Sequence, residues 1–238
     1  MSLSVLTWNV EWATPRARRT RHILDRIDRH APEVVCLTET HESLLSPRGH
    51  TICSRPDAGY LVREGRRKVM LWSQELWERV DDLGLDSMPP GRFVAGVTRT
   101  SLGEISVVGV CIPWFGSRTE SRRGPARKAR WEDHREYLHG LRHVLERRAT
   151  ERVIVIGDFN QAIGTASRAP TDLQRALRDA LPAGIAIATG DLVFEGRHNI
   201  DHIALSDDLV AESVDAISNT HDGRALSDHF GVVAKVSV

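Results

Sequence analysis

This sequence contains few cysteines, no long apolar run and no excess of either charge. Only three of the 238 residues are cysteine, and none forms a Cys-x-x-Cys pair. We therefore expect no disulfide framework, zinc site or redox motif. No apolar stretch approaches the roughly 20 residues that a membrane-spanning helix needs, and the amino end lacks the basic segment that opens a signal peptide. These absences predict a cytoplasmic protein with reduced thiols and no membrane span.

Basic and acidic residues balance, with 32 Lys and Arg against 32 Asp and Glu. This balance excludes a globally basic nucleic-acid coat protein. Basic residues nevertheless gather at 16–21 and at 118–130. The second group consists of Arg118, Arg122, Arg123, Arg127, Lys128 and Arg130, with Glu120 as the only acid among them. Each group is either a solvated loop or a positive rim that attracts an anionic substrate.

Length and composition predict one domain over residues 1–238. The chain is 41% hydrophobic and 27% charged, as in ordinary globular proteins, and its length suits one large core rather than two. We find no internal repeat, low-complexity segment or linker, and no feature that predicts an oligomeric state.

Apolar periodicity predicts a mixture of strands and helices. Residues 3–8, 18–30 and 34–37 have the patterns of strand, helix and strand, which is a βαβ-like opening. Short strands that suit antiparallel pairing follow at 51–54, 59–63, 68–73, 76–81, 93–99 and 104–112. After a loop at 116–130, helices are predicted at 131–148 and 170–181, and strands at 152–156, 185–189, 203–206, 211–218 and 230–237. The pattern by itself predicts a mixed α/β fold.

Polar side chains recur at the edges of apolar, strand-like runs. The five segments are Thr7-Trp8-Asn9, Leu37-Thr38-Glu39-Thr40, Gly157-Asp158-Phe159-Asn160, Asn199-Ile200-Asp201-His202 and Ser227-Asp228-His229. Polar groups at the ends of buried strands are where α/β proteins keep their chemistry. The segments therefore mark a candidate active site.

The spacing within two of these segments limits what their side chains can do. Asp158 and Asn160 are two residues apart, so in a strand both face the same way and can together position a water and a phosphoryl oxygen. Asp228 and His229 are adjacent and face opposite ways in a strand, so Asp228 need not be the carboxylate that holds His229. A carboxylate partner would fix the tautomer of a histidine and raise its pKa.

Together the five segments resemble the endonuclease/exonuclease/phosphatase (DNase I-like) superfamily, in the family's order and from Thr7 to His229. The resemblance implies a four-layer α/β sandwich, in which two packed mixed β-sheets are flanked by helices. It also implies a phosphoric ester hydrolase that depends on Mg²⁺ or Mn²⁺.

The resemblance further implies a role for each matching residue. Glu39 is the counterpart of the principal metal ligand, and Asp228 lies at the metal side as a direct or indirect ligand. Asp158 orients or activates the attacking water.

The remaining matches surround the phosphate. Asn9 and Asn160 correspond to residues that hydrogen-bond around the metal and the phosphate. Asp201 corresponds to the partner of His229, and His229 contacts the scissile phosphate as a general base or as a cationic stabiliser.

One position departs from the family pattern. Many members carry a His or Tyr after the strand that corresponds to 104–112, but this chain continues Pro113-Trp114-Phe115. Three explanations compete: Trp114 stacks on a base or a lipid-like group, His134 supplies the missing function, or water protonates the leaving group. Because His134 falls on the apolar stripe of the helix at 131–148, a half-buried structural histidine is the alternative for that residue.

Substrate class is the open question at this stage. A nuclease is the first choice, because Trp114 and the arginines Arg118, Arg122 and Arg123 suit a cleft that holds phosphates beside the scissile one. Small phosphodiesters, inositol phosphates and phospholipid head groups are the alternatives, although no amphipathic helix indicates a membrane surface. A non-catalytic binding module on the same fold is the rival of another class.

Overall fold

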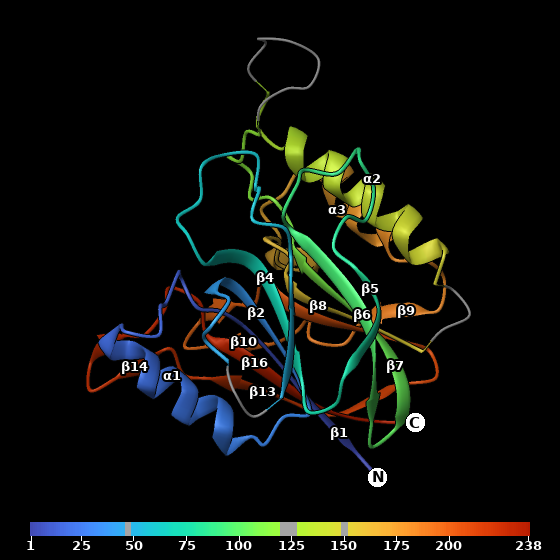
Figure 1. Cartoon of the computed structure of the whole chain (residues 1–238). Coiled ribbons are helices and arrows are strands. Elements are labelled where there is room, and N and C mark those ends of the chain that lie inside the picture. The colour runs from blue at the N-terminus through green and yellow to red at the C-terminus, as the bar shows by residue number, and fades with distance from the viewer. Residues whose placement is uncertain (46–48, 120–127, 149–151) are drawn as a thin grey trace.

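The computed structural model describes residues 1–45, 49–119, 128–148 and 152–238, and within them two six-stranded sheets pack face to face (Figure 1). The first sheet has the order β13 (Val210–Ile217), β16 (Gly231–Ser237), β1 (Leu3–Asn9), β2 (Val34–His41), β4 (Arg66–Ser73) and β3 (His50–Cys53). The second has the order β5 (Trp77–Asp81), β6 (Phe93–Thr100), β7 (Gly103–Cys111), β8 (Val153–Asp158), β12 (Asp201–Ser206) and β9 (Ile185–Ile187).

Helices cover the outer faces of both sheets. The helices are α1 (Arg18–Arg29), α2 (Glu132–Glu146) and α3 (Thr171–Ala180), with one short 3₁₀ turn, η1 (Gly164–Ala166). In Figure 1, α1 lies over the first sheet, while α2 and α3 lie together over the second. Two small hairpins, β10 (Val193–Phe194) with β11 (Arg197–His198) and β14 (Thr220–His221) with β15 (Arg224–Ala225), complete the described elements.

Three apolar clusters hold these layers together. Val5 belongs to the cluster between the two sheets, whereas its neighbour Leu6 belongs to the cluster under α1, which contributes Ile23. Leu138 of α2 and Leu177 of α3 belong to a third cluster on the outer face of the second sheet. Because successive strand residues face opposite sides, each inner strand contributes side chains to two of these clusters. The predicted four-layer sandwich is confirmed.

Most elements lie where the apolar patterns place them, with one clear error. The strand predicted at 59–63 is wrong: no strand forms there, Gly59 has a left-handed φ of 76°, and Leu61 is 100% exposed. The carboxylate of Asp57 accepts a hydrogen bond from the Gly59 N–H, which fixes a turn instead. Both small hairpins and η1 were not predicted, because such short elements leave no periodicity to detect.

Strand ends bring the polar segments of the sequence to one edge of the sandwich. β1 runs parallel to β2, with Asn9 beside Thr38, and β7 runs parallel to β8, with Cys111 beside Asp158. β12 is antiparallel to β8 and begins at Asp201, directly opposite Asp158. β1 also packs against β8 across the interface between the sheets. The carboxyl ends of β1, β2, β7 and β8 therefore meet.

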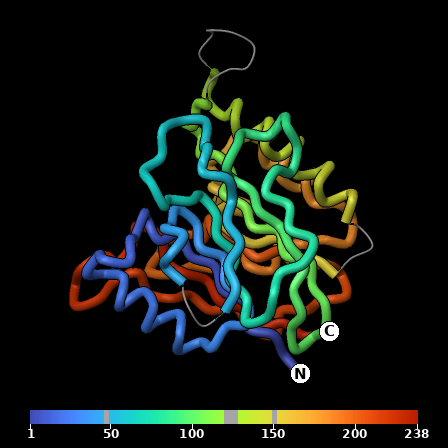
Figure 2. Tube along the Cα trace, in the orientation of Figure 1, coloured from blue at the N-terminus to red at the C-terminus, as the bar shows by residue number. Residues whose placement is uncertain are grey.

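The carboxyl-terminal strand contributes to the same edge. β16 pairs antiparallel with β1, so the two chain termini lie near each other at the opposite edge (Figure 2). The residues just before β16 are thereby brought beside the end of β1, where the Ser227 hydroxyl donates to the Asn9 carbonyl over 2.6 Å. None of the described helices combines the length and apolar character needed to cross a membrane.

Candidate active site

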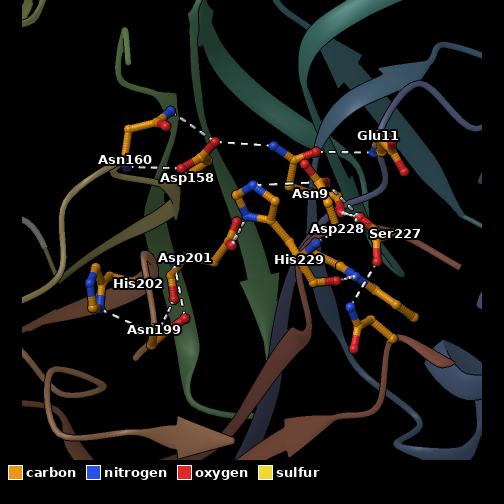
Figure 3. A network of polar contacts seen from close by, with 12 residues as sticks. Asn9, Glu11, Asp158, Asn160, Asn199, Asp201, His202, Ser227, Asp228 and His229 are labelled. Atoms are coloured by element: carbon orange, nitrogen blue, oxygen red, sulfur yellow. Dashed lines mark hydrogen bonds and ion pairs between the residues drawn. The ribbon is translucent and has the colours of Figure 1, made fainter. Parts of the chain in front are cut away.

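Asp158 lies at the centre of a hydrogen-bond network at this edge (Figure 3). Its Oδ1 accepts the backbone N–H of Asn160 over 2.8 Å, and its Oδ2 accepts the side-chain amides of Asn160 over 2.9 Å and of Asn9 over 3.1 Å. The Asn160 amide also donates to the Ile112 carbonyl over 2.8 Å. Three donors from two sheets therefore fix one buried carboxylate.

Asn160 reaches Asp158 by a route that differs from the predicted one. The strand geometry expected over 158–160 ends at Asp158, and Asn160 has a left-handed φ of 53°. The chain turns at this point, and the carboxylate of Asp158 accepts the N–H two residues on, as in an Asx turn. The two side chains meet as expected, but a turn rather than a strand brings them together.

Asp201 and His229 form the pair that the resemblance implies. His229 Nδ1 lies 2.6 Å from Asp201 Oδ2, and Asp201 is almost fully buried. The carboxylate therefore holds the Nδ1 proton, and His229 Nε2 is left to face the remainder of the site. Asp228 Oδ1 lies 4.0 Å from that Nε2, with the Asp228 side chain 67% exposed.

Burial and neighbouring charges shift the protonation of this cluster. Burial, reinforced by the negative charge of Asp201, raises the pKa of Asp158 to about 7. Burial lowers the pKa of His229, but the Asp201 carboxylate outweighs that effect and raises it to about 10. At neutral pH, His229 is therefore a cation beside a carboxylate that can take up a proton.

Glu39 lies on the other wall, on β2. Its φ of 46° is left-handed, and its carbonyl accepts the N–H of Trp12 where the regular alternation of β2 is interrupted. The Glu39 carboxylate receives a hydrogen bond of 2.6 Å from the Lys68 ammonium on β4. Asn9 is the last residue of β1. Its side-chain oxygen accepts the Glu11 N–H, which fixes the orientation of the amide.

An exposed aromatic rim follows the end of β7, whose last residue, Cys111, pairs with Asp158. Trp114 is 51% exposed and meets Phe115 edge-on with ring centroids 4.8 Å apart, and the Arg130 guanidinium lies 5.5 Å from the Phe115 ring. Arg118 is also exposed. Arg122 and Arg123, the other predicted substrate-binding arginines, lie outside the described residues.

His134 is the one predicted substrate contact that the structure removes from the surface. It is fully buried, with Nδ1 2.7 Å from the Pro113 carbonyl and Nε2 3.2 Å from the Gln161 side chain. Burial lowers its pKa, and Nδ1–H donates to the Pro113 carbonyl, which can only accept. His134 therefore anchors the turn that carries Trp114 and does not meet substrate in this conformation.

A sequence model of the Endonuclease/Exonuclease/phosphatase family matches residues 6–229. The chain belongs to this family. It is therefore a hydrolytic phosphoesterase. No curated protein sequence matches it.

Several other proteins of known structure have the same fold as this endonuclease/exonuclease/phosphatase protein. A 3′ phosphatase (NExo) from Neisseria, bound to product DNA hairpin, is 16% identical with a TM-score of 0.70, and 98% of each chain is covered. An AP endonuclease from Archaeoglobus fulgidus is 20% identical with a TM-score of 0.66 and 98% coverage of each chain. Humanized D. rerio TDP2 is 16% identical, with a TM-score of 0.70, covering 100% of this chain and 99% of its own.

The acidic residues of this endonuclease/exonuclease/phosphatase protein fit a hard divalent cation. Asp158, Asp201 and His229 place one ligand atom each within 4.8 Å of one another, the only such group among the described residues. Asp201 Oδ1 is buried, and none of the described residues donates a hydrogen bond to it. A buried carboxylate oxygen that receives no hydrogen bond would be stabilised by a cation or a water nearby.

His229 itself is a poor ligand in this group, since its Nδ1 proton is held by Asp201 and the ring is charged at neutral pH. Glu39 and Asp228, the predicted ligands, offer carboxylates from β2 and from the segment just before β16, and neither belongs to the tight group. Their role as metal ligands stays a prediction.

Lys68 and Trp12 are the parts of the site that the sequence did not reveal. Lys68 opens the apolar run at 69–71, and Trp12 follows Asn9 in a segment without periodicity. Lys68 lies next to Glu39 through strand pairing between β2 and β4, and Trp12 through the hydrogen bond from its N–H to the Glu39 carbonyl. A charged residue at the start of a predicted strand usually marks a solvated end, so no local signal identified it.

Proposed function

We propose that the protein is a Mg²⁺- or Mn²⁺-dependent phosphodiesterase that cleaves nucleic acid. The observation that carries the proposal is the arrangement of Asp158 opposite the Asp201–His229 pair, with a raised pKa on both Asp158 and His229. A base whose pKa lies near neutral and a fixed cation beside it are what hydrolysis of a phosphate ester requires.

Asp158 serves as the general base toward the attacking water. Its pKa of about 7 lets the carboxylate accept a proton at neutral pH, and three hydrogen bonds hold it in one orientation. Because both Asn160 amide hydrogens are used, on Ile112 and on Asp158, Asn160 positions the base rather than the phosphate.

His229 serves as a cationic donor to a phosphoryl oxygen. With Nδ1 bonded to Asp201, the protonated ring presents Nε2–H to the cleft. A preorganised positive donor stabilises the negative charge that develops on the phosphoryl oxygens. Of the two roles that the resemblance left open, the raised pKa of His229 favours the cationic one.

Glu39 and Asp228 would hold the divalent cation. When bound, such a cation supplies Lewis-acid stabilisation of the phosphoryl group and of the leaving oxygen. Carboxylate oxygens are the ligands that Mg²⁺ and Mn²⁺ prefer.

Nucleic acid is the proposed substrate because an exposed aromatic and basic rim follows β7, the strand whose end lies beside the base. Trp114 and Phe115 offer faces for unpaired bases, and Arg118 and Arg130 offer guanidinium groups for flanking phosphates. The Neisseria 3′ phosphatase of the same fold holds a DNA hairpin product. The three free cysteines accord with the reducing, cytoplasmic setting expected from the sequence.

The proposal is tested by hydrolysis of a single-stranded oligonucleotide, bis-p-nitrophenyl phosphate and p-nitrophenyl phosphate, each with EDTA, Mg²⁺ or Mn²⁺. Asp158→Asn removes the base, and Asp172→Asn on the exposed face of α3 is the matched control. We expect metal-dependent cleavage of diesters that Asp158→Asn abolishes and Asp172→Asn retains. Preference for the monoester would favour a phosphatase, and no turnover of any ester would favour the binding module.

A further inference from the structure

Lys68 is a buried cation at the wall where the metal is proposed to bind. Its side chain is 7% exposed, and Nζ lies 2.6 Å from Glu39 Oε1. Nζ also lies 4.8 Å from the centre of the Trp12 ring and 5.6 Å from that of Tyr60. Residues from three separate segments of the chain thus surround one ammonium.

These surroundings keep the ammonium charged. Burying a cation is costly unless an opposite charge or an aromatic face compensates for lost water. The Glu39 carboxylate, 2.6 Å from the ammonium, and the rings of Trp12 and Tyr60 supply that compensation. The Lys68 ammonium is therefore a fixed positive charge next to the Glu39 carboxylate, which is predicted to hold the metal.

A fixed charge at this place opposes a divalent cation. One oxygen of the Glu39 carboxylate already accepts the ammonium. A cation at either oxygen must displace Lys68 or remain within a few ångströms of it, and in a half-buried site that repulsion is only partly screened. An anion that enters the cleft offsets the excess positive charge.

We propose that Lys68 weakens divalent-cation binding at Glu39 in the free enzyme and thereby couples metal binding to the arrival of a phosphate ester. Lys68 is a positioning residue: it holds the Glu39 carboxylate in place and makes the metal and the substrate phosphate bind cooperatively. By linkage, the phosphate also binds more tightly when the metal is present. The inference rests on the proposed metal site.

The test measures metal binding without turnover. Free Mn²⁺ is followed by electron paramagnetic resonance in the wild type, Lys68→Gln, Lys68→Met and Lys235→Gln. Lys68→Gln keeps a hydrogen-bond donor without the charge, Lys68→Met keeps the apolar stem, and Lys235→Gln removes one charge from an exposed position on β16. Thermal unfolding identifies the variants that fold. The Mn²⁺ measurement needs only one folded Lys68 variant.

We expect the Kd for Mn²⁺ to fall about fivefold or more in the Lys68 variants, within the usual range of coupling between sites, and to be unchanged in Lys235→Gln. Addition of dimethyl phosphate should tighten Mn²⁺ binding in the wild type and have less effect in the Lys68 variants. Unchanged or weaker Mn²⁺ binding in the Lys68 variants would overturn the inference.

Glu39→Gln separates this outcome from failure of the proposed function. If Mn²⁺ binds wild type and Glu39→Gln equally well, the metal does not bind at Glu39, so the assignment of Glu39 as a ligand and the role of Lys68 are both wrong. If Glu39→Gln weakens binding while Lys68→Gln and Lys68→Met do not tighten it, the metal site stands and the role of Lys68 is wrong.

Discussion

Asp158 and Asp201 lie directly opposite each other in the antiparallel pairing of β8 and β12. Two buried carboxylates at facing positions repel each other. A histidine beside Asp201 and side-chain amides beside Asp158 offset that repulsion. His229 pairs with Asp201, while Asn9 donates to Asp158. The charge of Asp201 therefore raises the pKa of both Asp158 and His229.

Replacement of Asp201 should release His229 from its charged state. In metal-free protein with EDTA, NMR of the histidine ring should show that wild-type His229 stays protonated until pH approaches its pKa of about 10. In Asp201→Asn the largest raising charge is lost while burial still lowers the pKa and Asp158 and Asp228 still raise it, so the ring should titrate well below 10. A wild-type ring that already titrates near 6.5 would contradict the assignment.

The same pair should make stability depend on alkaline pH. The folded pKa of His229 is raised from 6.5 to about 10, so its stabilising contribution is complete below pH 6.5 and is lost as pH rises through 10. Chemical denaturation in EDTA at pH 6, 8 and 10 should show wild type losing stability across this window relative to His229→Gln. A constant difference between the two proteins would mean that the pair contributes no such linkage.

Asp158 should destabilise the folded protein as it ionises, because its charged form is unfavourably buried. Its pKa is raised from 3.8 to about 7, so the folded protein loses stability as pH rises from 3.8 through 7. Relative to Asp158→Asn, which cannot ionise, metal-free wild type should therefore be progressively less stable between pH 4 and pH 7. Asp172→Asn at an exposed position is the control and should follow wild type.

Trp114 should matter for nucleic acid and not for small esters. Stacking of one base on an aromatic ring contributes roughly 1–3 kcal/mol, so Trp114→Ala should raise KM for a single-stranded oligonucleotide by about fivefold to a hundredfold. Turnover of bis-p-nitrophenyl phosphate should change little. Leu76→Ala removes another exposed apolar side chain, which lies beyond the end of β4 that is far from the site, and should affect neither substrate. Equal losses on both substrates would show that Trp114 shapes the site rather than binding bases.

The sequence predicts the residues in the motif segments of this site better than it predicts Lys68. Asp158, Asp201 and His229 lie in short segments next to apolar runs, and their order along the chain carries the family resemblance. Lys68 escaped prediction because its partner Glu39 is 29 residues away and reaches it through pairing of β2 with β4. Contacts set by sheet pairing and by left-handed turns such as that at Asn160 leave no trace in periodicity.

Asn9 gives a final test of how the base is held. The resemblance assigns it to the metal and phosphate environment, whereas the structure has its amide donating to Asp158 and its oxygen accepting the Glu11 N–H. If Asn9 positions the base, Asn9→Ala should lower kcat by about tenfold to a hundredfold, as loss of a supporting hydrogen bond commonly does, with KM unchanged. The pKa of Asp158 in metal-free protein should also rise, because the lost hydrogen bond lowers it. If instead Asn9 binds the phosphate, KM should rise while the pKa of Asp158 moves little, so steady-state kinetics and carboxylate NMR on one variant distinguish the two roles.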